Sequence, residues 1–93
     1  MENVKVSVIV PVYNVETYLE EALMSLKNQT LKEIEFLIIN DGSTDNSQKI
    51  IEEIAQDDPR FRVFNVKNGG IGKAFNLGVS EAKGEYIAEF ESD

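Results

Sequence analysis

The segment VSVIVPVYN (residues 6–14) decides the fold. Apart from Ser7, its first five residues are β-branched and apolar, which is typical of a strand covered on both faces. Pro11 is expected to end this strand, because proline has no N–H to donate to a neighbouring strand. A buried strand of this kind favours a parallel sheet lying between helices.

Helical and strand patterns alternate through the rest of the chain. Apolar residues at helical spacing and short apolar runs predict helices within 19–26, 47–54 and 71–82, and strands at 36–39, 62–66 and 86–90. Asn14 is expected to cap the first helix, and Ser43 or Thr44 the second.

The alternation predicts the topology. A β-α-β-α-β-α-β order with short connections indicates an α/β fold, a Rossmann-like half with right-handed crossovers and helices on both faces of a parallel sheet. The expected strand order is 3-2-1-4. Its topological switch point lies between strands 1 and 4, and open sheets bind ligands at the carboxyl ends of the strands there.

Length and composition narrow the classes of function. Ninety-three residues suit a single domain, 1–93. Nine basic against seventeen acidic residues give a net charge of −8, which disfavours binding to nucleic acid. The chain has no Cys and no His, so disulfides, thiolate zinc sites, cysteine nucleophiles and imidazole bases are excluded.

Targeting signals are not evident in the sequence. No apolar run approaches the roughly 18 residues of a membrane span, and the first residues lack the form of a signal peptide. A cytoplasmic location is expected, with the parent protein able to associate with the cytoplasmic face of a membrane through segments outside this chain.

Unusual residues follow three strands that are neighbours in the expected order. They are PVYN (11–14), DGSTD (41–45) and ESD (91–93). Tyr13 can pack on a flat base, and Asp41 can accept a hydrogen bond from a base N–H. Glu91 and Asp93 offer oxygen ligands for Mg²⁺ or Mn²⁺, which typically bridge a diphosphate to one or two carboxylates. Together they favour a metal-dependent nucleotide site.

Each of these features has a simpler interpretation when taken alone. DGSTD (41–45) can be only a turn and a helix cap, and Tyr13 can be a packing residue. Glu91 and Asp93 can be a solvated chain end. Lys73 can be a solvated helix residue or a cation near the phosphates. The convergence of these residues on one end of one sheet favours the functional interpretation.

The ordered set of motifs resembles the start of a family 2 glycosyltransferase of the GT-A fold. The matching stretches are VSVIVPVYN (6–14), DGSTD (41–45), NLG (76–78), GEYI (84–87) and ESD (91–93). Such enzymes transfer a sugar from a nucleotide-sugar donor, often a UDP-sugar, to an acceptor. The resemblance implies that Asp93 ligates the metal that holds the diphosphate, with Glu91 near the ribose or the metal. The acceptor stays open: a polysaccharide, a lipid carrier, a protein or a small molecule.

The candidate site residues follow from the strand ends and the resemblance together. The nucleotide-binding candidates are Pro11, Val12, Tyr13, Asn14, Asp41, Gly42, Lys73 and Glu91, and the metal-ligating candidates are Glu91 and Asp93. No catalytic residue is assigned, because the family's base is expected outside this chain.

Three positions depart from the family pattern. Phe75 stands where many members have Arg, and Glu91 replaces a commoner Asp. Glu89 lies in a strand expected to be covered on both sides, so either that face is open or the carboxylate has a partner.

The chain stops where the resemblance places the metal motif. We therefore expect it to be the donor-binding part of a longer enzyme, inactive in transfer alone, with an exposed fourth-strand edge that can pair with a second copy. Two other classes remain as alternatives. One is a module that binds a nucleotide or metal without chemistry, and the other is a receiver-like signalling domain, which would need an acidic pair after strand 1.

Overall fold

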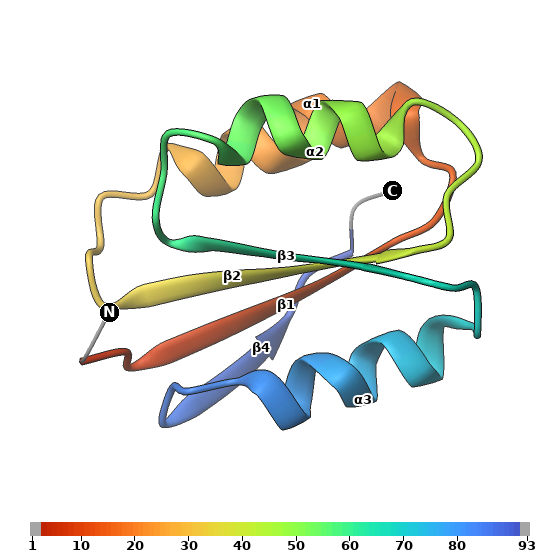
Figure 1. The fold of residues 1–93 in the computed structure, drawn as a ribbon. Helices are drawn as coiled ribbons and strands as arrows, with labels where there is room; N and C mark the ends of the chain where they lie inside the picture. The colour runs from red at the N-terminus through yellow and green to blue at the C-terminus, as the bar shows by residue number, and fades with distance from the viewer. Residues whose placement is uncertain (1–2, 92–93) are drawn as a thin grey trace.

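The computed structural model describes residues 3–91. Strands and helices alternate along it (Figure 1): β1 (Val6–Val12), α1 (Glu16–Lys27), β2 (Ile34–Asp41), α2 (Ser47–Ala55), β3 (Phe61–Val66), α3 (Ile71–Glu81) and β4 (Tyr86–Glu89). All strand pairs are parallel, in the order β3-β2-β1-β4. The predicted α/β class and the predicted strand order are confirmed.

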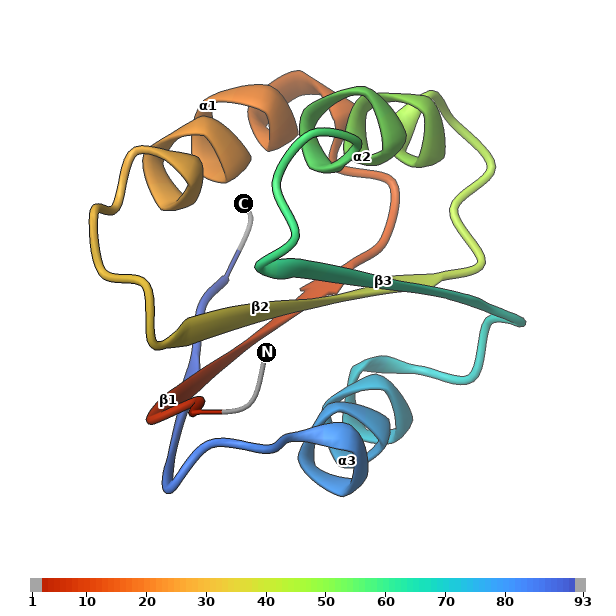
Figure 2. The ribbon, with the colours of Figure 1, turned by 60° about the vertical axis from the view of Figure 1, so that its left-hand side comes forward.

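The sheet lies between two layers of helices. Helices α1 and α2 cover one face and α3 covers the other (Figures 1 and 2). A hydrophobic core lies on each face of the sheet. Alternate residues of β1 pack into one core or the other, because successive side chains of a strand point to opposite faces. Val8 and Val10 pack in the core beneath α1 and α2, whereas Ile9 packs against Ala74 of α3. This double coverage explains the continuous apolar runs in the sequence.

Strand β1 continues through Pro11, so its predicted end at this residue is wrong. Pro11 pairs in register with Ile39 of β2. The carbonyl group of Ile9 accepts the N–H of Phe90, directly after β4, at 2.9 Å, so Ile9 and the β1 residues two positions along direct their backbone polar groups toward the β4 side. The described pairing with β4 ends near Ile9. The nitrogen of Pro11 is on the β4 side of β1, so its missing hydrogen removes no bond to β2.

Strand β4 forms an open edge. All four of its residues are exposed, with Tyr86 and Ile87 exposed at 69% and 45%. Glu89 lies opposite Ile9 in the register and is also exposed, so its carboxylate stays in contact with water. Of the two explanations offered for Glu89, the open face of the strand therefore holds among the described residues. Within residues 3–91, no helix has both the length and the apolar character required to span a bilayer.

Candidate functional site

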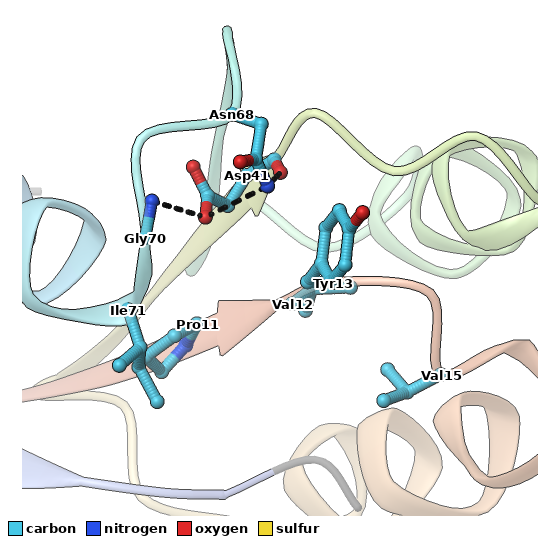
Figure 3. Close-up of a pocket in the computed structure, with 8 residues that line it drawn as sticks. All are labelled: Pro11, Val12, Tyr13, Val15, Asp41, Asn68, Gly70 and Ile71. Carbon is cyan, nitrogen blue, oxygen red and sulfur yellow. Dashed lines mark hydrogen bonds between the residues drawn. The ribbon is translucent and has the colours of Figure 1, made fainter.

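A pocket of about 330 Å³ opens at the carboxyl ends of β1 and β2 (Figure 3). It is lined by Pro11, Val12, Tyr13, Val15, Asp41, Asn68, Gly70 and Ile71. The ring of Tyr13 is 50% exposed and the side chain of Ile71 is 63% exposed, so both offer apolar surface to a ligand. The pocket therefore combines an apolar wall with the polar groups of Asp41 and Asn68, as small-molecule sites commonly do.

Asp41 is fixed in this pocket by the loop between β3 and α3. One carboxylate oxygen accepts the N–H of Gly69 at 2.8 Å, and the other accepts the N–H of Gly70 at 3.0 Å. The side-chain amide of Asn68 donates to the backbone carbonyl of Asp41 at 3.0 Å. Because a carboxylate oxygen can accept more than one hydrogen bond, Asp41 retains capacity for a ligand N–H.

Gly42 allows the two loops to approach each other. Its φ of +69° lies in the left-handed region, which side chains rarely adopt. A Cβ atom at Gly42 would lie only 2.6 Å from the backbone nitrogen of Asn68. The glycine after Asp41 is therefore required by backbone conformation and by space, and it keeps Asn68 against the end of β2.

The loops that follow β1 and β2 hold each other through side chains. The side-chain oxygen of Asn14 accepts the N–H groups of Thr44 and Asp45, at 2.7 and 3.3 Å. In return, the carboxylate of Asp45 accepts the N–H of Glu16 at 3.2 Å, and the hydroxyl of Ser43 accepts the N–H of Asn14 at 3.1 Å. These bonds fix the backbone that carries Tyr13 into the pocket.

The predicted helix caps are therefore wrong. Val15 and Asn46 occupy the N-cap positions of α1 and α2, and neither caps its own helix through its side chain. The N–H groups at the start of α1 instead donate to side chains across the site: that of Glu16 to Asp45 in the loop before α2, and that of Val15 to the hydroxyl of Ser47, the first residue of α2. Burial acts to raise the pKa of Asp45, but hydrogen bonds from Ser47 and Glu16 outweigh it and hold this pKa below its usual range.

The structure brings most of the predicted nucleotide-binding residues together. Four of them line the pocket directly, namely Pro11, Val12, Tyr13 and Asp41. Asn14 and Gly42 hold the two loops that bound it. Lys73 is exposed and lines a neighbouring pocket of about 260 Å³, which shares Asp41 and Asn68 with the first. Phe75 packs against the core beneath α3.

The predicted metal ligands, Glu91 and Asp93, follow β4 in the sequence. Glu91 is exposed, and Asp93 lies outside the described residues. Among residues 3–91, no three acidic side chains gather closely enough to enclose a metal ion. An exposed carboxylate after β4 nevertheless fits Mg²⁺ or Mn²⁺, because these ions are usually held by one or two carboxylates, with water and phosphate completing the shell.

Four lining residues were not predicted from the sequence: Val15, Asn68, Gly70 and Ile71. The Asn-Gly-Gly run at 68–70 is typical of a turn, and a turn pattern does not reveal what the turn packs against. Ile71 is the first residue of the apolar spacing that predicts a helix within 71–82, yet it is 63% exposed rather than buried in the core. Exposed apolar residues that border a pocket indicate a ligand-binding surface only once the fold is known.

The sequence model described as Glycosyl transferase family 2 matches residues 7–93. The chain belongs to glycosyltransferase family 2. It is 50% identical over 93 residues to the putative glycosyltransferase EpsH of Bacillus subtilis, and this match covers the whole chain but 27% of EpsH. Family 2 membership confirms the resemblance carried by the strand-end motifs.

Solved structures of glycosyltransferases share the fold. TarS 1–349 of Staphylococcus aureus, solved in complex with UDP-GlcNAc, superposes with a TM-score of 0.86 and 38% identity. The mannosyltransferase PcManGT of Pyrobaculum calidifontis, solved with GDP-Man and Mn²⁺, superposes with a TM-score of 0.85 and 26% identity. Each match covers 96% of this chain, but only 26% and 27% of the respective structures. The chain thus spans about a quarter of the length of the proteins that it matches.

Proposed function

We propose that this chain binds the donor nucleotide of a metal-dependent family 2 glycosyltransferase that uses a UDP-sugar. The observation that carries the proposal is the pocket at the carboxyl ends of β1 and β2, in which an exposed Tyr13 ring lies beside a fixed Asp41 carboxylate. The complex of TarS with UDP-GlcNAc supports the choice of nucleotide, since that structure shares the fold at 38% identity.

The pocket's chemistry suits a base with a ring N–H. Tyr13 and Ile71 offer apolar surface for a planar ring to cover. Asp41 can accept a ring N–H of uracil or guanine, whereas adenine has no ring N–H on its pairing edge. A carboxylate that already accepts two backbone N–H groups is held in place, so the ligand meets a prearranged acceptor.

The diphosphate requires positive charge, because the chain has a net charge of −8. We assign Glu91 and Asp93 to hold Mg²⁺ or Mn²⁺ at the end of β4. When bound, the metal would stabilise negative charge on the departing diphosphate. Lys73 approaches from the neighbouring pocket, and its ammonium group adds attraction through solvent.

Calorimetric titration tests the proposal. UDP is expected to bind in the presence of Mn²⁺ at least tenfold more tightly than without it, about 1.4 kcal/mol. Asp93→Asn should remove that difference, whereas Asp57→Asn, which removes the same charge at an exposed site paired with Lys27, should preserve it. GDP and AMP serve as comparison ligands. Binding of AMP as tight as that of UDP would contradict the assignment of the base.

The transfer reaction belongs to the whole protein. We propose that acceptor-binding residues and the base lie outside these 93 residues, so that the chain forms one donor-binding domain. Assays with several UDP-sugars and Mn²⁺ should show no transfer by this chain, and measurable turnover would contradict the division. The identity of the acceptor and the expected cytoplasmic location require experiments on the full enzyme.

The open β4 edge supports one further part of the proposal. Its exposed Tyr86 and Ile87 lie on a strand without a second neighbour among the described residues, which favours pairing with another copy of the chain. Light scattering across a concentration series should show a dimer or larger assembly. A monomeric mass at high concentration would argue against this pairing.

A further inference from the structure

Strand β4 has little of its own to fix its register. It is four residues long, pairs only with β1 among the described residues and buries none of its side chains, although Phe90, directly after it, packs in part against the core beneath α1 and α2. Register is weakly specified in strands that do not bury one face, because a slip then exposes no new apolar surface. What fixes β4 must therefore lie largely outside the strand itself.

A buried carboxylate lies where the chain enters β4. Glu35 of β2 is 2% exposed, and one of its oxygens accepts the hydroxyl of Ser7 at 2.6 Å and the N–H of Lys83 at 2.7 Å. The hydroxyl of Ser7 accepts the N–H of Gly84 at 2.8 Å. Two consecutive N–H groups of the α3–β4 connection thus bind to one pair of side chains from β1 and β2.

The connection passes so close to Ser7 that no side chain fits there. A Cβ atom at Gly84 would lie 2.8 Å from both the nitrogen and the hydroxyl oxygen of Ser7. The backbone of β4 continues directly from this contact, since the N–H of Tyr86 donates to the carbonyl of Lys5 at 2.9 Å. The starting point of β4 is therefore determined by the contact of Gly84 with Ser7.

Arg62 of β3 balances the charge of this carboxylate. Its guanidinium donates to the second oxygen of Glu35 at 3.0 Å and to the backbone carbonyl of Glu81, at the end of α3, at 2.8 Å. Burial acts to raise the pKa of Glu35, but hydrogen bonds from Ser7, Lys83 and Arg62 outweigh it and hold the pKa below its usual range. Glu35 is thus held as a carboxylate that joins β1, β2, β3 and the entry to β4.

We propose that Glu35 is a positioning residue that sets the register of β4 and, through it, the place of Glu91 in the donor site. A slip of two residues along β1 would carry Glu91 roughly 6–7 Å, well beyond the reach of a metal ligand. The inference rests on the proposed function for what Glu91 binds. The base pocket contains no residue of β4, because its lining residues belong to β1, β2, the loops that follow β1 and β3, and the first residue of α3.

Hydrogen exchange measured by NMR tests the effect on β4 without any ligand. In Glu35→Gln, the amides of Tyr86 and Phe90, which donate to Lys5 and Ile9, should lose roughly tenfold more protection than the amides of β2 residues 37–40. Glu33→Gln is the matched control, because this carboxylate lies two residues earlier, its side chain is 43% exposed, and it pairs only with Lys5 among the described residues. Equal loss of protection throughout the sheet, or unchanged protection in β4, would overturn the proposal.

Calorimetry tests the consequence for the donor site. In Glu35→Gln, the Mn²⁺-dependent gain in UDP affinity should fall at least fivefold, whereas uridine, which lacks phosphates, should bind within twofold of its original affinity. A general loss of folding would weaken the binding of UDP and of uridine equally. If β4 loses protection while the Mn²⁺-dependent gain persists, Glu35 holds the strand but does not position Glu91, and the proposal is wrong.

Ser7→Ala provides the second variant in case Glu35→Gln does not fold. It removes the acceptor of the Gly84 N–H and leaves the pair between Arg62 and Glu35 in place, so the same selective loss in β4 is expected. A wild-type chain that binds no UDP would overturn the proposed function. The exchange experiment would then still decide whether Glu35 holds β4.

Discussion

The carboxylate of Asp41 accepts the backbone N–H of Gly70 at 3.0 Å, which anchors the loop before α3 to the end of β2. The residue proposed to recognise the base is therefore also a structural anchor of the pocket. Ligand binding and stability are coupled at this position, and experiments there must measure both.

Replacing Asp41 by Asn should reduce both properties. The amide would present a donor to one of the two backbone N–H groups that the carboxylate now accepts, which is expected to lower the free energy of unfolding by about 1.5–3 kcal/mol. UDP affinity should fall at least tenfold beyond any effect of unfolding. Denaturant titration and calorimetry measure the two effects. Glu53→Gln, at an exposed position of α2, is the control and should change neither.

Asn14 combines an unusual backbone conformation with two accepted hydrogen bonds. Its φ of +49° is tolerated by Asn and Gly better than by Ala, and its side-chain oxygen bonds the N–H groups of Thr44 and Asp45. Asn14→Ala should cost about 2–3 kcal/mol of unfolding free energy. Asn14→Gly removes the hydrogen bonds without the backbone strain and should cost roughly 1 kcal/mol less. Equal stability of the two variants would contradict a role for strain.

Replacement by Ala should destabilise the protein at Gly42 and stabilise it at Gly72. At Gly42, positive φ and a Cβ position 2.6 Å from the nitrogen of Asn68 predict a loss of at least about 2 kcal/mol. At Gly72, in the first turn of α3, a Cβ would have no atom of the described residues within 4 Å apart from its own stretch of helix backbone, and Ala is expected to stabilise the protein by up to about 1 kcal/mol. Thermal or denaturant unfolding of both variants decides the point. A stabilised Gly42→Ala would be incompatible with the loop geometry described above.

Acid should unfold the chain partly through Glu35. Its pKa is lower in the folded state than its ordinary value of 4.5, so the unfolded chain binds more protons near that pH. The contribution of Glu35 is therefore complete above the unfolded pKa and is lost as pH falls below about 4.5 through the folded pKa. Between pH 5 and about pH 3, Glu35→Gln should lose less stability than wild type. If the free energy of unfolding changes with pH in the same way in both proteins, the protonation of Glu35 does not contribute to acid unfolding.

Much of the fold was predictable from local patterns. Continuous apolar runs located the strands and period-3.6 spacing located the helices, and general rules of chain connection then gave the strand order. Pro11 was misjudged because a proline in a strand is disruptive only where its missing N–H faces a partner. The position of β4 relative to β1 decides that, and it is not encoded near Pro11.

The sequence by itself determined the alternating fold, the strand order and the polar residues at the strand ends, because each depends on local periodicity and on general rules of chain connection. Only the tertiary structure decided which groups those residues bond. Asn14 and Thr44 are 30 positions apart, and Ser7 and Gly84 are 77 apart. Such pairs follow from how the sheet brings distant loops together, and a carboxylate or amide in isolation does not specify which N–H group it will meet.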